Sequence, residues 1–182
     1  MLSPKDIRVR AATMAEVGAL NELVEQAVRQ LSVGYYTPQQ IDSALQYMFG
    51  IDTQLILDAT YYVAESEGQV IGCGGWSQRR TLYGGDQSKT AAGPLLDPAR
   101  EAARIRAFFV HPQWARQGIG RAIIGVCEAA ARRAGFRGLE LAATLPGEPL
   151  YRALGYAAGE RTAIPFPDGQ SLPIVNMHKP LR

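Results

Sequence analysis

The chain has 182 residues, with 19 Lys and Arg against 17 Asp and Glu, so its formal net charge is +2. Hydrophobic residues make up 47% of it and charged residues 20%, the mixture typical of one soluble domain with a core. The balanced charge argues against a nucleic-acid binder, and no run reaches the roughly 18 apolar residues of a membrane span. The first ten residues contain no apolar stretch, which predicts a cytoplasmic protein without a secretion signal.

The two cysteines also limit the classes of protein to which the chain can belong. Cys73 and Cys127 stand in apolar surroundings, and neither a CxxC pair nor a His/Cys cluster accompanies them. They are therefore expected to be reduced, buried thiols. The sequence predicts neither a disulfide scaffold nor a metal site.

The N-terminal part of the chain is predicted as one strand followed by two helices. Residues 7–11 alternate between apolar and basic side chains, the pattern of a half-buried strand. Thr13 and Glu16 have the spacing of a capping box, and apolar residues at helical spacing follow until Gly34. Residues 37–40 form a second start signal, with a threonine cap, a proline at the first helical position and an amide at the third.

The middle of the chain is predicted as a hairpin, a long loop and a central strand. Residues 61–64 and 69–76 are β-prone and are separated by a turn sequence. Three glycines in the second of these strands indicate a bulge or a close backbone approach. The segment 77–100 is rich in glycine and proline and has little periodicity, and ordered loops of that length are usually functional. Residues 102–110 then form a strand whose apolar second half indicates a central place in the sheet.

The C-terminal part alternates between helices and strands. An amphipathic helix begins at Ile119 and ends at Gly135. A short strand at 139–141, a short helix at 148–154 and a final strand at 172–178 follow. A strand, helix and strand in succession imply a parallel pair, and the hairpins on either side imply a mixed sheet, so the predicted class is α/β.

The segment between the central strand and the amphipathic helix carries the clearest chemical signal. Gly118 and Gly120 stand at the helix start, where free backbone amides and the positive end of the helix attract anions. Arg116 and Arg121 add formal positive charge beside these amides. We interpret the segment as a cradle for a phosphate or pyrophosphate. The alternative is a glycine-rich turn that only joins the strand to the helix.

Two other phosphate-binding motifs fit this segment poorly. A P-loop requires G-x-x-x-x-G-K-[ST], and neither this spacing nor the Lys-Ser/Thr pair is present in the sequence. The dinucleotide fingerprint requires a third glycine where Ile123 stands. Glu140 has the distance of the acidic residue in that fingerprint, but it follows elements of the wrong pattern.

The residues around the cradle resemble the acetyl-CoA signature of the GCN5-related N-acetyltransferase (GNAT) superfamily. Residues 110–112, Val-His-Pro, and then 116–122, RQGIGRA, are similar to the family pattern V-x-P, a spacer, and Q/R-x-x-G-x-G/A at the head of a helix. Residues 150–156, LYRALGY, resemble the LYxxLGF segment of the family. The order of predicted elements also agrees from Ile7 to His178, so the resemblance covers almost the whole chain.

The resemblance implies a single α/β domain over residues 1–182 with the acyl-CoA N-acyltransferase fold, a mixed and mostly antiparallel sheet flanked by helices. It implies acetyl-CoA as co-substrate, no metal, and direct attack by a small-molecule or peptide amine within a ternary complex. The loop 77–100 would lie on the acceptor side. Neither nucleic acid nor membrane is an implied partner, and homodimers are common in this fold. The alternative is a non-catalytic acyl-CoA sensor or interaction protein with the same fold.

The resemblance also implies which residues bind acetyl-CoA. The end of the central strand would pair with the pantetheine arm, and the glycine loop would hold the pyrophosphate through its amides. The residues concerned are Phe108, Phe109 and Val110 in the strand, and Arg116, Gln117, Gly118, Ile119, Gly120 and Arg121 in the loop. The pattern departs at Ala115, where the family has Gln or Arg, and at 144–147, where an Asn is often found.

The catalytic residues follow from the same resemblance. Tyr151 would lie near the thioester sulfur, where its hydroxyl protonates the departing thiolate; the alternative is that it only packs one helix face. Glu140 is the candidate base for the amine proton, because a glutamate on this strand has that role in some family members. Surface glutamates are common, however, and Glu65 and Glu101 are weaker alternatives.

Overall fold

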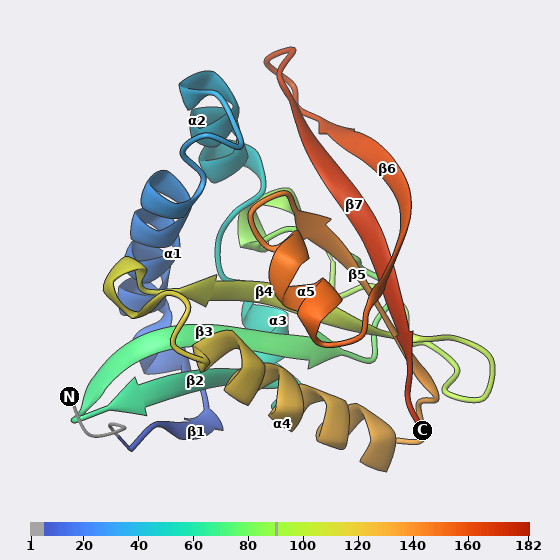
Figure 1. The fold of residues 1–182 in the computed structure, drawn as a ribbon. Helices are drawn as coiled ribbons and strands as arrows, with labels where there is room; N and C mark the ends of the chain where they lie inside the picture. Colours follow the sequence, from blue (N-terminus) through green and yellow to red (C-terminus); the bar gives the residue numbers. More distant parts are fainter. Residues whose placement is uncertain (1–5, 90) are drawn as a thin grey trace.

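The computed structural model describes residues 6–89 and 91–182. Seven strands form one sheet in the order β1-β2-β3-β4-β5-β7-β6 (Figure 1). All neighbouring strands are antiparallel except β4 and β5, which are parallel. The prediction of a mixed, mostly antiparallel sheet with one central parallel pair is confirmed.

Helices cover both faces of this sheet. The strands are β1 (Arg8–Ala11), β2 (Tyr61–Ser66), β3 (Gln69–Ser77), β4 (Ala103–Val110), β5 (Gly138–Thr144), β6 (Ala157–Pro165) and β7 (Ser171–Pro180). The helices are α1 (Val17–Leu31), α2 (Pro38–Tyr47), α3 (Thr53–Leu57), α4 (Ile119–Arg133) and α5 (Glu148–Ala153), with short 3-10 turns η1 (Met14–Glu16), η2 (Asp86–Ser88) and η3 (Pro112–Trp114). One apolar cluster contains side chains of α4 and α5, and the other contains those of α1, α2 and α3. Within the two described ranges, no helix is long and apolar enough to cross a bilayer.

Both predicted start signals form caps: the Thr13 box opens η1, which leads into α1 at Val17, and the Thr37 box opens α2. The Thr13 amide donates to Glu16 Oε2 at 2.8 Å, and the Gln40 amide donates to Thr37 Oγ1 at 3.1 Å. The sequence analysis missed α3, because five residues are too few for a helical pattern to stand out. Asp52 caps this helix by accepting a hydrogen bond from the Gln54 amide at 3.1 Å.

The glycines of β3 allow α4 and β4 to approach the strand closely, as predicted. A Cβ at Gly72 would lie 2.6 Å from Ile119 Cγ2, at the first turn of α4. A Cβ at Gly74 would lie 2.7 Å from the ring of Phe108. Both distances are shorter than a side chain tolerates, so these glycines fix the position of the elements that carry the predicted CoA-binding residues.

The parallel strands β4 and β5 separate soon after they begin. Their pairing consists of Ala103 with Leu139 and Arg104 with Glu140, after which the two strands diverge. Further along β4, Ala107 has a φ of 53° and interrupts the regular ladder with β3. Its carbonyl accepts a hydrogen bond from the Tyr61 hydroxyl at 2.8 Å. The divergence leaves the second half of β4 without a neighbour on the β5 side.

Tyr36 lies between α1 and α2, and its hydroxyl connects these helices to the sheet. Its hydroxyl donates to the Pro173 carbonyl at 2.7 Å and accepts from the Leu145 amide at 2.9 Å, and burial raises its pKa to about 12. Replacing Tyr36 by Phe leaves both backbone groups without this partner. We expect the free energy of unfolding, measured in urea, to fall by about 1–3 kcal/mol. Tyr35→Phe, at an exposed neighbouring position, is the control and should leave the free energy of unfolding unchanged. If both substitutions lowered it equally, the Tyr36 hydroxyl would not connect the helices to the sheet.

Candidate active site

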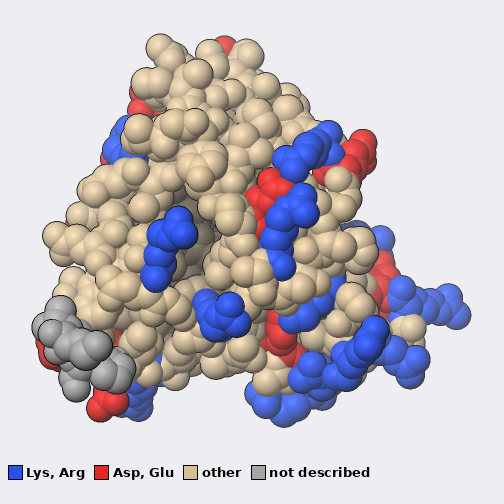
Figure 2. All heavy atoms as spheres, in the orientation of Figure 1, with Lys and Arg blue, Asp and Glu red and all other residues tan. Residues whose placement is uncertain are grey.

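A cavity of about 260 Å³ lies where β4 and β5 diverge. Its walls come from these two strands, from α1, from the segment between α2 and α3, from residues 82–84, and from the starts of α4 and α5. Figure 2 shows a hollow in the middle of this face, with basic side chains next to it. The cavity therefore opens beside the end of β4, where the sequence analysis places the phosphate cradle.

The structure brings most of the predicted site residues to this cavity. Those that line it are Phe108, Phe109, Val110, Arg116, Gly120 and Tyr151. Gln117, Gly118, Ile119 and Arg121 belong to the same loop and helix start but do not line the cavity itself. The strand end, the glycine loop and the tyrosine are thus parts of one site, although they are distant in sequence.

The glycine loop presents unpaired backbone amides at the start of α4. Gly118 caps the helix with a φ of 85°, a left-handed conformation that favours glycine, and Arg116 has a φ of 61°. Across residues 6–89 and 91–182, no hydrogen bond uses the backbone amide of any residue from Arg116 to Arg121. Free amides at the positive end of a helix are a suitable site for an anionic group such as a phosphate.

Tyr151 lies in α5 and lines the cavity. Its ring packs against Phe108 and Tyr156, with centroids 6.4 and 5.7 Å away. The side chain is largely buried, and burial raises its pKa well above the usual value of a tyrosine. Among the described residues no group hydrogen-bonds to its hydroxyl, so the hydroxyl is protonated and available to a ligand in the cavity.

None of the candidate bases lines the cavity. Glu140 lies where β4 and β5 are still paired, half exposed, and its Oε2 accepts a hydrogen bond from Arg104 at 2.6 Å. Glu65 is bound to Arg10 on β1, and Glu101 forms an ion pair with Arg80. Of the residues that the structure describes, no aspartate or glutamate lines the cavity.

The segment 77–100 forms one wall of the cavity, and it is held firmly. Apart from the 3-10 turn η2, the structure assigns it no helix or strand beyond β3 in the part that it describes. The Gly85 amide donates to the Met48 carbonyl at 2.8 Å, and the Asp86 amide donates to the Ile51 carbonyl at 3.1 Å. Residues 82–84 are thereby fixed against the connection between α2 and α3.

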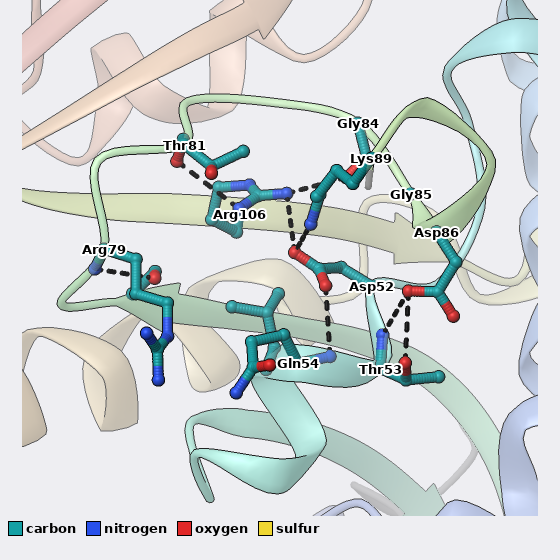
Figure 3. Close-up of polar contacts among 12 residues, drawn as sticks. Asp52, Thr53, Gln54, Arg79, Thr81, Gly84, Gly85, Asp86, Lys89 and Arg106 are labelled. Atoms are coloured by element: carbon teal, nitrogen blue, oxygen red, sulfur yellow. Dashed lines mark hydrogen bonds and ion pairs between the residues drawn. The ribbon is translucent and has the colours of Figure 1, made fainter. Parts of the chain in front are cut away.

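A buried ionic cluster lies behind this wall (Figure 3). Arg106 Nη2 is 3.1 Å from Asp52 Oδ2 and 2.8 Å from the Gly84 carbonyl, and Lys89 binds the same carboxylate oxygen. The side chains of Arg106 and Asp52 are only 2% and 3% exposed, and Nε of Arg106 has no partner among the described residues. Burial lowers the pKa of Arg106 to about 10, and burial together with Arg106 lowers that of Lys89 to about 7.

Sequence reasoning missed this cluster, although one signal was present. Arg106 interrupts the otherwise apolar second half of β4, and a charge inside a central strand requires a partner. That partner, Asp52, lies 54 positions away in the sequence, so only the fold reveals the pair. The cluster therefore connects the loop residues that line the cavity to strand β4, which also lines it.

Comparison with known proteins agrees with this fold. The family described as "Acetyltransferase (GNAT) domain" matches residues 58–158. No curated protein sequence matches the chain. Many solved structures match it, and all of those given below share less than 25% identity with it, so they establish the fold.

Three of these structures illustrate the similarity. A Rhodopseudomonas palustris protein described as "GCN5-Related N-acetyltransferase: Aminotransferase, Class-II" is 17% identical, with a TM-score of 0.73 over 100% of this chain and 99% of that one. The PaiA N-acetyltransferase of Thermoplasma acidophilum, in complex with coenzyme A, is 11% identical, with a TM-score of 0.66 over 96% and 99%. YncA of Salmonella typhimurium, a putative acetyltransferase with acetyl-CoA, is 18% identical, with a TM-score of 0.64 over 97% and 95%.

Proposed function

The chain belongs to the GCN5-related N-acetyltransferase (GNAT) family, and from this we propose that it transfers the acetyl group of acetyl-CoA to a primary amine by direct attack in a ternary complex. The observation that carries the proposal is one cavity that is lined by the open edge of β4 and by Tyr151 with its free hydroxyl, and that adjoins the loop 116–121 with its unpaired amides. Each of these features suits a different part of acetyl-CoA.

Acetyl-CoA binding is supported by backbone groups more than by side chains. The pyrophosphate would accept hydrogen bonds from the amides of residues 116–121 at the positive end of α4. The pantetheine arm would lie along residues 108–110, where β4 has lost its β5 neighbour. Because these contacts use the main chain, Ala115 in place of the usual Gln or Arg is compatible with binding.

The proposed reaction begins with attack by the amine nitrogen on the thioester carbonyl carbon. A C–N bond forms, and the carbonyl π electrons move to oxygen. When the carbonyl is restored, the C–S bond breaks and its electron pair leaves on sulfur. Tyr151 gives its phenolic proton to this thiolate, the amine nitrogen loses one proton to water, and a proton from solvent restores the Tyr151 hydroxyl, so the net products are an N-acetyl amide and the CoA thiol.

The amine proton requires an acceptor, and the cavity contains no carboxylate among its described lining residues. Glu140 does not line the cavity, and its carboxylate binds Arg104. We therefore propose that the amine enters as the neutral base and that water takes the proton after the attack. A site of low polarity favours the neutral form of an amine, since burial disfavours the charged form.

Replacing Tyr151 by Phe tests the proposed acid directly. We expect kcat, measured as thiol release from acetyl-CoA, to fall on the order of 100-fold, because the thiolate then leaves without a proton donor. Because the pKa of Tyr151 is raised, the loss should be the same at every pH between about 6 and 9. Tyr156→Phe is the matched control, since the Tyr156 hydroxyl binds Glu128 instead of facing the cavity, and it should keep kcat within a few fold. Equal turnover of wild type and Tyr151→Phe would remove Tyr151 from the mechanism.

A non-catalytic acyl-CoA sensor of the same fold is the second candidate. The unpaired amides of residues 116–121 favour CoA binding in both cases, so binding alone does not separate them. The free hydroxyl of Tyr151 favours the enzyme, because a sensor has no need of a proton donor at the sulfur. A cytoplasmic location and a homodimer stay predictions from the sequence.

A further inference from the structure

On the sides formed by α1, the α2–α3 connection and the loop at 82, the cavity is lined mainly by apolar side chains, with Ser32 and Tyr83 as the polar exceptions. Opposite the glycine loop, side chains from α1, from the α2–α3 connection, from the loop at 82 and from β4 form what we call the apolar wall: Ala27, Val28, Leu31, Phe49, Leu82 and Phe109. Phe49 and Phe109 meet edge to face, with ring centroids 5.8 Å apart. The charged side chain that lines the cavity, Arg116, belongs to the cradle and not to this wall.

No aspartate or glutamate is among the described residues that line the cavity, and three aspartates of the neighbouring segments are already paired. Asp52 is bound to Arg106 and Lys89, as described above. Asp58 holds Arg79 through contacts of 2.7 and 2.9 Å, and Asp86 accepts hydrogen bonds from the amide and hydroxyl of Thr53 at 2.9 and 3.1 Å. A second ammonium group on the acceptor would therefore be desolvated at this wall without a counter-charge.

The size and rigidity of the cavity also restrict the acceptor. A volume of about 260 Å³ has to hold the acetyl end of the thioester and part of the pantetheine arm together with the acceptor, and it lies below the range of roughly 300–1,000 Å³ of ligand pockets. The loop side of the wall is fixed by the backbone bonds of Gly85 and Asp86 and by Gln87 Nε2, which donates to the Phe49 carbonyl at 2.9 Å. A cavity of this size with a preformed wall favours an acceptor with a compact body.

We infer that the acceptor is a small monoamine with an apolar body, such as an aromatic ring or a short alkyl chain, and not a polyamine or another polycation. The inference rests on the proposed acetyl transfer, and it names the substrate class of the same cavity. The apolar wall binds the body of the amine and favours the neutral, nucleophilic form of its nitrogen. This accounts for a site without a carboxylate base.

The test compares phenethylamine with 1,4-diaminobutane as acceptors for the wild-type protein. We expect kcat/KM for phenethylamine to be higher by about 100-fold, from burial of the ring and from the unpaired second charge of the diamine. Equal values, or a preference for the diamine, would overturn the inference while leaving the proposed acetyl transfer intact. If acetyl-CoA binds but neither these nor other amines are acetylated, the proposed function fails, and the inference fails with it.

A charge placed in the wall should change this preference. In Leu31→Glu, the new carboxylate lies beside the acceptor, and we expect the preference for phenethylamine to fall by about tenfold or more. Leu57→Glu makes the same change at a leucine that is 67% exposed and outside the cavity, and it should leave the ratio unaltered. An unchanged ratio in a folded Leu31→Glu protein would overturn the inference. If that variant does not fold, Leu82→Glu in the loop makes the same test.

Discussion

Gly120→Glu is expected to abolish binding of acetyl-CoA. Gly120 is the second residue of α4 and lines the cavity, so a carboxylate there would lie against the proposed pyrophosphate site. A like charge at close range in a binding site costs several kcal/mol, so we expect Kd, measured by calorimetry, to rise by about 1,000-fold or more. A Cβ at this position would also lie 2.7 Å from Leu150 Cδ2, a contact that the end of the leucine relieves by moving.

Two control variants separate the effect of the new charge at position 120 from the effect of the new side chain's size. Gly120→Ala introduces the Cβ without the carboxylate and should bind acetyl-CoA far better than Gly120→Glu. Gly125→Glu adds the same charge to an exposed position of the same helix, where nothing lies within 4 Å of a Cβ, and it should bind acetyl-CoA as the wild type does. If Gly120→Glu retains wild-type affinity, the loop before α4 does not hold the pyrophosphate.

Asp52→Asn is expected to cause the largest loss of stability among the single changes considered. Arg106 and Lys89 share this carboxylate in a buried place, so its neutralisation leaves the Arg106 guanidinium, and the Lys89 ammonium when it is protonated, without an anion. Removing one partner of a buried ion pair destabilises a protein by about 3–5 kcal/mol, and we expect a decrease of this size in the free energy of unfolding in urea. The substitution keeps the shape of the side chain, so the effect reports mainly the charge.

Asp42→Asn is the matched control for this measurement. Asp42 forms an exposed ion pair with Arg29 at 2.9 Å, and such pairs contribute about 0–1 kcal/mol. Adding Arg106→Met to Asp52→Asn should recover part of the lost stability, because it removes one of the unpaired cations. A decrease below about 1 kcal/mol for Asp52→Asn alone would show that the cluster does not hold the loop and β4 together.

The sequence predicts local features of this fold well where their causes are local. The capping boxes at Thr13 and Thr37 involve residues three positions apart; the first opens the 3-10 turn η1, which leads into α1 at Val17, and the second opens α2. The glycines of β3 predict a close approach, although the partner that approaches Gly72, Ile119, becomes visible only in the fold. The two motifs of the GNAT family predict a shared site, and the cavity contacts both.

Features that depend on contacts between residues far apart in the chain could not be predicted from the sequence. Alternation along a strand predicts that Glu140 points away from Leu139, but not that β4 and β5 are still joined at this point. The carboxylate therefore lies at the paired end of the strands, next to Arg104, and not in the opening between them. Likewise, nothing near Asp52 in the sequence indicates that it balances two cations, since both arrive from distant segments.

Acetyl transfer in this cavity is tested most directly by following both products of a single reaction. The protein is incubated with acetyl-CoA and phenethylamine, the free CoA thiol is titrated, and the amine is analysed by mass spectrometry. We expect one acetylated amine for each thiol released, with both falling together in Tyr151→Phe. Thiol release without an acetylated amine, or binding of acetyl-CoA with neither product across a wider set of amines, would contradict acetyl transfer in this cavity.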